Sequence, residues 1–434
     1  MSDWTRTTIG NLGHIVTGKT PPTAQAGNFG NWVPFITPRD MDGRKTITET
    51  ERYLSEQGVK AVYKALIPAG AVMVSCIGSD MGKVAISASR SVTNQQINSV
   101  VVSKGHSHQF VYYNLSKRKE ELRNAASGSA QPILNKRNFG ELEILAPPLP
   151  EQHAIAHILG TLDDKIEINR RMNGTLEALA QAIFKSWFVD FDPVRAKMAG
   201  RQPYGMETDT AALFPDRLVD SGTDLGMIPE GWEVKAIGDV AQTFGGTTPS
   251  TKKPEFWEGG TNYFCTPKDM STLNSPIILE TERQITESGV DAIGSGQLPA
   301  GVVLMSSRAP VGYLAISQVP VSVNQGIIAM VCESTLSNYY IFSWAHHNLE
   351  MIKANANGST FMEISKRNFR PLPIIDPGQD LAQMFNTSVA NLYEKIVLNL
   401  RQSLTLTSLR DTLLPKLMSG ELRVGEAEEM TKGE

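Results

Sequence analysis

Two long segments of the chain space their apolar residues in the heptad pattern of a coiled-coil helix. After Pro147-Pro148-Leu149-Pro150 we expect a helix from about Glu151 to Phe188, because prolines precede it and an acidic residue lies in its first turn. Its stripe advances by alternating steps of four and three residues, which is the spacing of a packed helical seam. The stripe comprises Ile155, Leu159, Leu162, Ile166, Asn169, Asn173, Leu176, Ala180, Ile183 and Trp187.

A second stripe repeats the first at a constant offset near the end of the chain, at Phe385, Val389, Leu392, Ile396, Asn399, Ser403, Leu406, Arg410, Leu413 and Leu417. Only Arg410 is clearly out of place. We expect the two helices, each roughly 50–55 Å long at about 1.5 Å per residue, to pack against each other. Asn169 and Asn399 share one seam position, and two interpretations stay open: the amides fix the register of the pair, or each lies at a wet edge.

The helices follow two copies of one duplicated domain. Landmarks recur in order and at a nearly constant offset: Phe35-Ile-Thr-Pro-Arg-Asp-Met41 with Phe264-Cys-Thr-Pro-Lys-Asp-Met270, Pro68-Ala-Gly70 with Pro299-Ala-Gly301, Asn94-Gln95 with Asn324-Gln325, and Lys136-Arg-Asn-Phe139 with Lys366-Arg-Asn-Phe369. A solenoid unit has only about 20–50 residues, so a period of half the chain indicates a duplicated domain. Each copy contains short β-rich runs, such as Ala71–Ile77 and Val302–Ser306.

These patterns divide the chain into a first copy at 1–150, a helical region at 151–192, a connector at 193–230, a second copy at 231–378, a second helical region at 379–424 and an acidic tail at 425–434. Several prolines and glycines together with many acids make 193–230 typical of an extended connector rather than a third domain. A length of 434 residues also favours two domains or more.

Composition excludes several classes of protein. Hydrophobic residues make up 41% and charged residues 20%, which is the profile of a folded, soluble protein. The three cysteines, Cys76, Cys265 and Cys332, are isolated, so neither a thiolate zinc site nor a disulfide framework is indicated and a cytoplasmic location fits best. We expect no secretory signal and no membrane span, because the longest apolar stretch, Ala65–Ile77, is short and contains proline and glycine.

The net charge of −4 at first sight argues against a nucleic-acid partner. Residues 1–150, however, carry 17 Lys and Arg against 11 Asp and Glu, whereas 231–378 carry 10 against 13. A DNA site needs only a local basic face. The second copy would therefore have to gather its few cations on one side.

Two motifs resemble catalytic sites but lack what those sites require, and the motifs of a methyltransferase are absent. Gly13–Thr20 matches a phosphate loop, yet Pro21 and Pro22 prevent the helix that the motif requires, and the second copy has no lysine there. Asp216, Glu233 and Lys235 fit the loose pattern of metal-dependent nucleases, but the first copy lacks matching residues and the pattern is very permissive. Neither the glycine-rich cofactor loop nor the Asn/Asp-Pro-Pro-aromatic loop of a methyltransferase is present.

Candidate DNA contacts remain on polar and basic turns, many of which recur in both copies. Arg, Lys, Gln and Ser can read base edges, while neighbouring cations hold phosphates. Each single cation is more often an ordinary solvated residue, and Asn94-Gln95 and Asn324-Gln325 are expected to be buried amides. The candidates are Lys19, Thr20, Thr37, Arg39, Ser79, Lys83, Ser129, Gln131, Lys136 and Arg137 in the first copy, and Thr247, Lys252, Lys253, Lys268, Arg308, Ser359, Lys366 and Arg367 in the second.

Several runs resemble the specificity subunits of Type I restriction–modification systems. They include Pro147-Pro-Leu-Pro-Glu-Gln152, Ile183-Phe-Lys-Ser-Trp-Phe-Val-Asp-Phe-Asp-Pro193, Ile228-Pro-Glu-Gly-Trp232 and Leu413-Leu-Pro-Lys-Leu-Met-Ser-Gly-Glu-Leu422. The resemblance covers essentially the whole chain. Asp376-Pro-Gly-Gln379 departs from the family's Pro-Leu-x-Glu-Gln pattern before the second helix, so the two ends could grip partners unequally.

The resemblance implies an α+β fold: two duplicated α/β target-recognition domains separated by two long antiparallel coiled-coil helices, with pseudo-twofold symmetry. It implies a non-catalytic subunit that reads a bipartite, asymmetric site on double-stranded DNA, the helix length setting the gap. Two modification (methyltransferase) subunits and restriction (translocase/nuclease) subunits would be its partners. This chain would bind no cofactor; S-adenosylmethionine would belong to the modification subunit, and ATP and Mg to the restriction subunit.

Partner contacts rest on the resemblance alone and fall on Glu151, Gln152, Ile155, Lys185, Trp187, Phe188, Phe191 and Leu414. Two other hypotheses come from different classes: a nuclease that uses Asp216, Glu233 and Lys235, and a helical scaffold that binds no DNA. The scaffold would explain the seams but not two duplicated, loop-rich domains with repeated basic turns.

Overall fold

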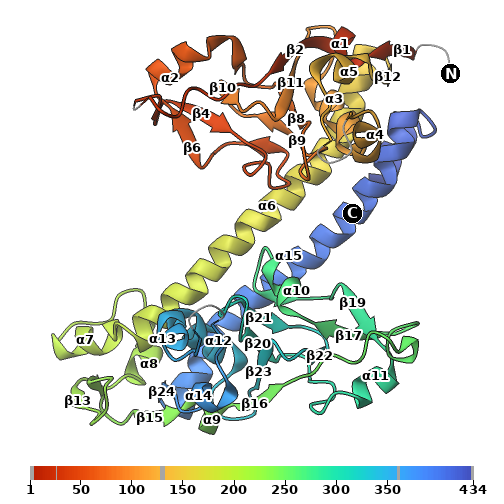
Figure 1. Cartoon of the computed structure of the whole chain (residues 1–434). Helices are drawn as coiled ribbons and strands as arrows, with labels where there is room; N and C mark the ends of the chain where they lie inside the picture. The colour runs from red at the N-terminus through yellow and green to blue at the C-terminus, as the bar shows by residue number, and fades with distance from the viewer. Residues whose placement is uncertain (1–3, 26, 128–131, 359–361, 432–434) are drawn as a thin grey trace. The chain divides into compact units, whose positions relative to one another are not determined.

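The computed structural model describes residues 4–25, 27–127, 132–358 and 362–431. The chain forms two compact units, the first from residues 1–167 with 402–434 and the second from residues 168–401. The boundary between the units falls inside two long helices, α6 (Leu149–Phe188) and α15 (Gln379–Ser419), so each helix contributes one part to each unit (Figure 1).

The larger sheet of the first unit has five strands in the order β2-β11-β8-β9-β5. Its neighbouring strands are antiparallel, except that β5 at the edge runs parallel to β9. The strands are β2 (Gly13–Thr17), β5 (Thr46–Ile47), β8 (Val72–Ser75), β9 (Val84–Ser87) and β11 (Ile97–Val102).

The second unit repeats this sheet strand for strand, in the order β16-β23-β20-β21-β18. Again only the edge strand, β18, is parallel to its neighbour. The strands are β16 (Gln242–Gly245), β18 (Ile277–Ile278), β20 (Val303–Ser306), β21 (Leu314–Ser317) and β23 (Ile327–Val331). The sequence repeat is therefore a repeat of topology, and the predicted β-rich runs contain the central strands β8 and β20.

Two smaller sheet elements recur as well. The order β6-β4-β10 in the first unit corresponds to β19-β17-β22 in the second, and the pair β1-β12 corresponds to β15-β24. The first unit adds β3 and β7 at the edges. These strands are β1 (Thr5–Thr8), β3 (Phe29–Gly30), β4 (Val33–Ile36), β6 (Arg52–Leu54), β7 (Leu66–Ile67), β10 (Ser91–Thr93), β12 (Glu143–Ala146), β15 (Glu233–Ala236), β17 (Asn262–Cys265), β19 (Arg283–Ile285), β22 (Val321–Val323) and β24 (Pro373–Asp376).

Both faces of each larger sheet are covered. Val72 and Val74 of β8 join the core that includes the helices of the first unit, while Met73 between them joins a second core on the opposite face. In β20, Val303 and Leu304 divide in the same way. A strand that is buried on both faces has a continuous apolar sequence rather than an alternating one, which is why the two runs stand out.

Short helices complete each unit. Ser107 and Ser337 cap equivalent helices, since each hydroxyl accepts a hydrogen bond from the amide three residues later. The helices of the first unit are α1 (Ile9–Leu12), α2 (Glu56–Ala61), η1 (Tyr63–Ala65), α3 (His108–Ser116), α4 (Lys119–Asn124) and α5 (Lys136–Glu141). Those of the second copy are α9 (Ile237–Val240), η2 (Pro254–Phe256), α10 (Pro267–Ser271), α11 (Glu287–Asp291), α12 (Asn338–His347), α13 (Leu349–Ala354) and α14 (Lys366–Phe369).

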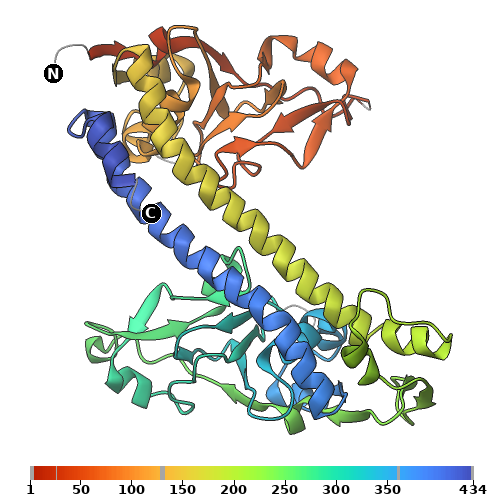
Figure 2. The same cartoon turned by 180° about the vertical axis from the view of Figure 1, so that it is seen from behind.

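The predicted seams are the buried faces of α6 and α15, and α15 crosses the near face of the second unit in Figure 2. Within that unit the two helices run in opposite directions, because Asn173 contacts Asn399 whereas Phe184 contacts Phe385. Although both helices are long, no helix among the described residues is apolar enough over a sufficient length to span a membrane.

The seam asparagines are buried, so the wet-edge interpretation is wrong. Asn169 is 1% and Asn399 is 3% exposed. The Asn169 side chain donates to the carbonyl of Asn399 at 3.3 Å, and the Asn399 amide donates to Oδ1 of Asn173 at 2.9 Å. A register shift would separate these buried amides from their partners, which supports the role of the pair in fixing register.

Arg410, the residue that breaks the second apolar stripe, lies in a polar cluster of the first unit. Its guanidinium donates to Oδ1 of Asp163 at 2.7 Å. The other carboxylate oxygen of Asp163 accepts from the hydroxyl of Tyr113 at 2.6 Å. The arginine therefore neutralises a largely buried carboxylate at the seam.

Residues 193–230 are not an extended connector. They contain most of α7 (Asp192–Met198), α8 (Thr208–Ala212) and a hairpin of β13 (Leu218–Asp220) with β14 (Met227–Pro229). Val194, Phe214 and Ile228 lie in the core of the second unit, and the Phe214 ring packs against Trp187. Such buried apolar residues stabilise a packed segment and are not expected in a solvated linker. The sequence did not reveal them, because they are widely spaced among many prolines and glycines. The acidic tail likewise contains a helix, α16 (Val424–Thr431), whose Ala427 is buried in the first unit.

We expect Arg410→Met to destabilise the first unit by about 1–3 kcal/mol, because it leaves the Asp163 carboxylate without its cation. The partial exposure of Arg410 keeps the loss below that of a fully buried pair. Urea unfolding followed by tryptophan fluorescence measures the change. Lys416→Met, at an exposed position of the same helix, is the control, and equal stability of the two variants would contradict the role of Arg410.

Candidate nucleic-acid interface

The loops that follow β8 and β20 are closed in the same way. At the end of each strand a serine hydroxyl, Ser75 or Ser306, accepts from the amide of the residue after the loop at 2.9 or 2.8 Å. The carbonyl of the same serine accepts from Gly82 or Gly312 at 2.9 or 3.0 Å. The β8 loop (residues 76–82) and the β20 loop (residues 307–312) are therefore equivalent, although the first is one residue longer and their sequences differ.

Each loop is hydrogen-bonded to two further segments, and together they form what we call the loop edge of the unit. In the first unit the Cys76 amide donates to Gln96, and its carbonyl accepts from Leu134. In the second unit Ser307 makes the same two bonds, with Gly326 and Ile364. The loop edge thus comprises residues 76–83, 94–96 and 132–137 in the first unit, and residues 307–313, 324–326 and 362–367 in the second.

Within the repeated Asn-Gln pairs only the asparagines hold the backbone, which corrects the expectation that both amides are buried. The side-chain oxygens of Asn94 and Asn324 accept backbone amides at 3.1 and 2.9 Å. Gln95 and Gln325 are exposed instead. Each accepts a hydrogen bond through Oε1, from Thr20 at 2.7 Å and from Thr248 at 2.8 Å, so both carboxamides are held in place with their NH₂ groups directed elsewhere.

Thr248 and not Thr247 is therefore the counterpart of Thr20, and it lies two residues after Gly246 just as Thr20 lies two residues after Gly18. These glycines also explain the close approach of the two segments. A Cβ on Gly18 would lie 2.1 Å from the carbonyl oxygen of Asn94, and one on Gly246 would lie 1.5 Å from that of Val323. The segment after β2 has no helix at Lys19, so it forms a loop and not a phosphate-binding helix start.

In the repeated Thr-Pro-cation turn, the threonine stabilises the turn itself and is not free to contact DNA through its hydroxyl hydrogen. Thr37 donates through its hydroxyl and backbone amide to Asp40, and Thr266 does the same to Asp269. These turns fix the position of the cation that follows each proline. Lys83 reaches the first turn from the β8 loop, because its ammonium donates to the Pro38 carbonyl at 2.9 Å and pairs with a loop carboxylate.

The candidate cations divide by whether a carboxylate neutralises them. Lys83, Arg137, Lys253, Lys268 and Arg308 form ion pairs. Within the described part of the chain the exposed side chains of Lys19, Arg39, Lys136, Lys252, Lys366 and Arg367 form none. Lys136 and Lys366 open the equivalent helices α5 and α14, directly after the capping residues Asn135 and Ser365. Ser129, Gln131 and Ser359 lie outside the described residues.

Two further cations, which the sequence pattern did not indicate, lie beside the loops. Arg123 in the last turn of α4 donates to the Ser79 carbonyl of the β8 loop at 3.2 Å. Lys353 in the last turn of α13 lies beside the β20 loop and pairs with Glu350 at 2.9 Å. The domain repeat relates the two positions. In the second unit Arg308, Lys353, Lys366 and Arg367 thus lie on or next to the loop edge. Glu363 and Glu350 pair with the first two, so Lys366 and Arg367 are the cations of this group that form no ion pair among the described residues.

Six of the eight expected partner contacts are buried in the cores of their units. Gln152 is 1% exposed and uses its amide on Ser107, Pro147 and His106. The other five, Ile155, Trp187, Phe188, Phe191 and Leu414, are buried in the cores of their units. None of these six residues is more than 9% exposed, so each offers little surface to a partner in this conformation. Only Lys185, which pairs with Asp190, and the half-buried Glu151, which accepts from Trp4, remain accessible.

The nuclease residues do not assemble into a metal site. Lys235 donates to Asp376 at 2.7 Å and pairs with Glu233 at 3.2 Å, and these contacts raise the pKa of the lysine. Asp216 pairs with Arg217 instead. No group of three or more His, Cys, Asp or Glu side chains among the described residues is placed to hold a metal ion.

The Cys76 thiol at the start of the β8 loop is not a reactive nucleophile. Burial raises the pKa of Cys76 to about 11, which keeps its thiol protonated near pH 7.

Comparison with known proteins identifies the family of this chain. Residues 1–178 and 229–380 match the family described as Type I restriction modification DNA specificity domain. The chain belongs to this family. It is 29% identical to the MjaIX specificity subunit of Methanocaldococcus jannaschii over 98% of this chain and 94% of the relative. It is 30% identical to the HindI specificity subunit of Haemophilus influenzae over 67% of this chain and 71% of the relative.

A solved structure shows the same fold at low identity. The S subunit of a Type I restriction–modification system from M. genitalium superposes with a TM-score of 0.58 and 16% identity, covering 96% of each chain. The predicted fold class, two duplicated domains with two long helices, is thus confirmed. Specificity subunits are the non-catalytic components of restriction–modification complexes, so family membership also supports the prediction that this chain is not an enzyme.

We expect Lys136→Gln and Lys366→Gln each to weaken DNA binding without changing the preferred sequence. If each lysine neutralises one phosphate, its loss reduces the slope of log K against log salt by about 0.9. Titrations of the assembled complex with a duplex at several salt concentrations measure the slope. Lys416→Gln, on an exposed face of α15, should leave the slope unchanged, and an equally unchanged slope in the loop-edge variants would exclude phosphate contacts there.

Proposed function

We propose that this chain reads a bipartite, asymmetric DNA site and directs partner subunits to it. The observation that carries the proposal is the pair of equivalent loop edges, which share their hydrogen-bonded frame and several cation positions but differ in loop sequence. Equal frames with unequal loops suit two half-sites of unlike sequence, one for each unit.

The division of labour follows from the chemistry of the duplex. Cations that recur in both units, such as Lys136 with Lys366, would hold phosphates and supply salt-dependent affinity. Loop side chains would contact base edges in the major groove, where each base pair presents its own pattern of donors and acceptors. Family membership supports DNA-sequence recognition, and the two-block form of the site is our proposal.

The long helices would carry the partners and set the gap. In the proposal two modification subunits dock on the helices and restriction subunits join the complex. Because α6 and α15 run through both units, their length would determine how many base pairs separate the half-sites. Accessible candidates for docking are Lys185 and Glu151, since the other expected contacts are buried.

Catalysis in this proposal belongs to the partners. S-adenosylmethionine would bind to the modification subunit, and ATP with Mg to the restriction subunit, while this chain binds none of them. The target base would leave the stack to reach the methyltransferase, because its reactive atom is inaccessible inside the duplex. A DNA partner of this kind implies that the complex works in the cytoplasm.

A base-resolution methylome tests the proposal. Cells that express the partner modification subunit should show a new bipartite motif only when this chain is also expressed. The control expresses this chain with a methyltransferase variant that cannot bind S-adenosylmethionine, and should show no motif. If an active modification subunit assembles with this chain and no new motif appears, the chain is a scaffold and not a DNA reader.

A further inference from the structure

One bridged pair of residues differs in chemistry between the two loop edges although its backbone is the same. Ile77 pairs with Ile133 as an isolated antiparallel bridge in the first unit, and Arg308 pairs with Glu363 in the second. The residue after each bridge makes the same bond, from Leu134 to the Cys76 carbonyl and from Ile364 to the Ser307 carbonyl, both at 2.9 Å. Ile77 is therefore the structural counterpart of Arg308, and Ile133 is the counterpart of Glu363.

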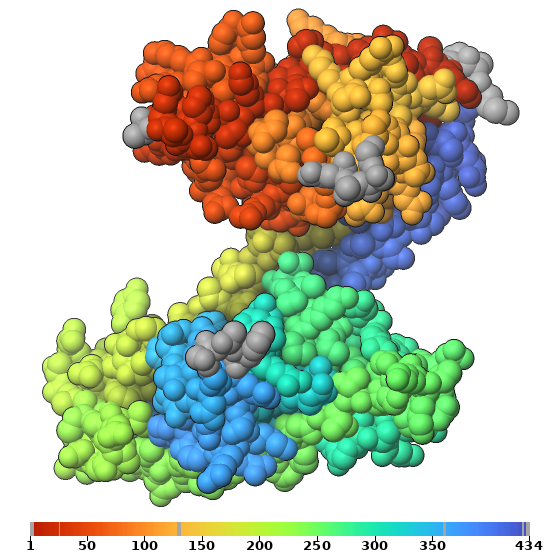
Figure 3. Space-filling model, viewed as in Figure 1, coloured from red at the N-terminus to blue at the C-terminus, as the bar shows by residue number. Residues whose placement is uncertain are grey.

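The side chains at this position are accessible in both units. Ile133 is 44% exposed and Ile77 is half-buried, and the side chains of Arg308 and Glu363 are 39% and 49% exposed. In Figure 3 the cyan segment that contains the β20 loop lies at the surface, beside the blue segment that contains α13. A ligand that approaches the loop edge can thus contact either pair.

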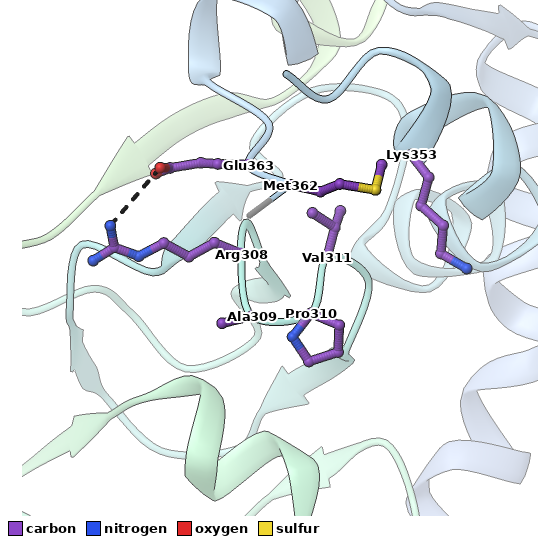
Figure 4. A pocket seen from close by; sticks show the side chains of 7 residues that line it. All are labelled: Arg308, Ala309, Pro310, Val311, Lys353, Met362 and Glu363. Atoms are coloured by element: carbon purple, nitrogen blue, oxygen red, sulfur yellow. Dashed lines mark ion pairs between the residues drawn. The ribbon is translucent and has the colours of Figure 1, made fainter. Parts of the chain in front are cut away.

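Arg308 lies at a surface hollow of about 610 Å³ lined by Ala309, Pro310, Val311, Lys353, Met362 and Glu363. Figure 4 shows Arg308 and Glu363 extending side by side with their charged ends joined by the ion pair, while Met362 and Lys353 extend to the other side. The contact between Nη1 of Arg308 and Oε2 of Glu363 is 3.8 Å, too long for a hydrogen bond. The guanidinium is therefore oriented by the carboxylate while its N–H donors stay available.

Neighbouring groups on the loop edges are similar in the two units. Arg123 and Lys353 are cations at equivalent helix ends, and Gln95 and Gln325 are held by equivalent threonines. Groups common to both units cannot distinguish two unlike half-sites. Discrimination has to come from positions that differ, and the bridged pair exchanges two apolar side chains for two charged ones on one backbone frame.

We propose that Arg308 and Glu363 determine base specificity in the half-site of the second unit by reading a guanine–cytosine pair, and that Ile77 with Ile133 contact a thymine methyl group in the other half-site. An arginine donates two hydrogen bonds to O6 and N7 of guanine, and a glutamate accepts from N4 of cytosine. The exposed Ile133 beside the half-buried Ile77 offers the thymine methyl an apolar contact surface but no donor. This inference rests on the proposed DNA-reading function and names the residues that perform it.

The test is selection from a randomised duplex pool by the assembled complex with its modification subunits. Wild-type complex should recover two blocks of bases. Arg308→Gln should lower the preference for one guanine in a single block about 5- to 150-fold, the range that corresponds to one bidentate base contact. Arg308→Lys should lose a similar preference, because lysine keeps the charge but lacks the planar fork.

Lys353→Gln is the matched control, since it removes a neighbouring cation that pairs with a glutamate, as Arg308 does, and that has a counterpart cation, Arg123, in the first unit. It should weaken binding to all sequences and leave the motif intact. Ile77→Arg with Ile133→Glu should introduce a guanine preference into the other block. A motif that Arg308→Gln leaves unchanged at every position would overturn the inference alone. A wild-type complex that binds DNA without any motif would overturn the proposed function itself.

Discussion

The buried central strand of each larger sheet, β8 in one unit and β20 in the other, determines where the loops of that unit lie. This strand is hydrogen-bonded to a neighbouring strand on each side, and its side chains are buried on both faces of the sheet. A shift of its register by one residue would therefore move every side chain of the strand from one core into the other. The last residue of the strand, Ser75 or Ser306, then closes the loop through its own hydroxyl and carbonyl. Backbone and serine contacts hold the loop, which leaves the outward side chains free to differ.

This arrangement separates stability from specificity. The frame depends on Ser75, Asn94, Gly18 and their counterparts, none of which has to match a DNA sequence. The bridged pair can change from two isoleucines to an arginine and a glutamate without loss of its backbone bonds. The long helices show a similar division. The buried side-chain amides of Asn169 and Asn399 restrict the register of the two helices, while the surrounding apolar residues stabilise their packing.

Periodicity made the long helices and the duplication predictable, because a heptad seam and an ordered set of landmarks depend on many residues at once. The connector was mispredicted since Val194, Phe214 and Ile228 are too widely spaced to form a pattern, yet each is buried. Burial could not be inferred for single polar residues either: Gln152 is in a core while Gln95 is exposed, and only their hydrogen-bond partners distinguish them. The bridged pair escaped detection because the loops differ in length by one residue, which hides the equivalence of Ile77 and Arg308.

In the proposed function, equivalent loops of the two units face different half-sites of one DNA site. Photo-crosslinking tests it most directly, with a photoreactive amino acid placed at the exposed Ser79 of the β8 loop or the exposed Ala309 of the β20 loop in the assembled complex. Mapping of the crosslinked bases should place Ser79 in one block of the recognised site and Ala309 in the other. Crosslinks from both positions to the same block, or to neither block in a complex that remains bound, would contradict this placement of the two loops.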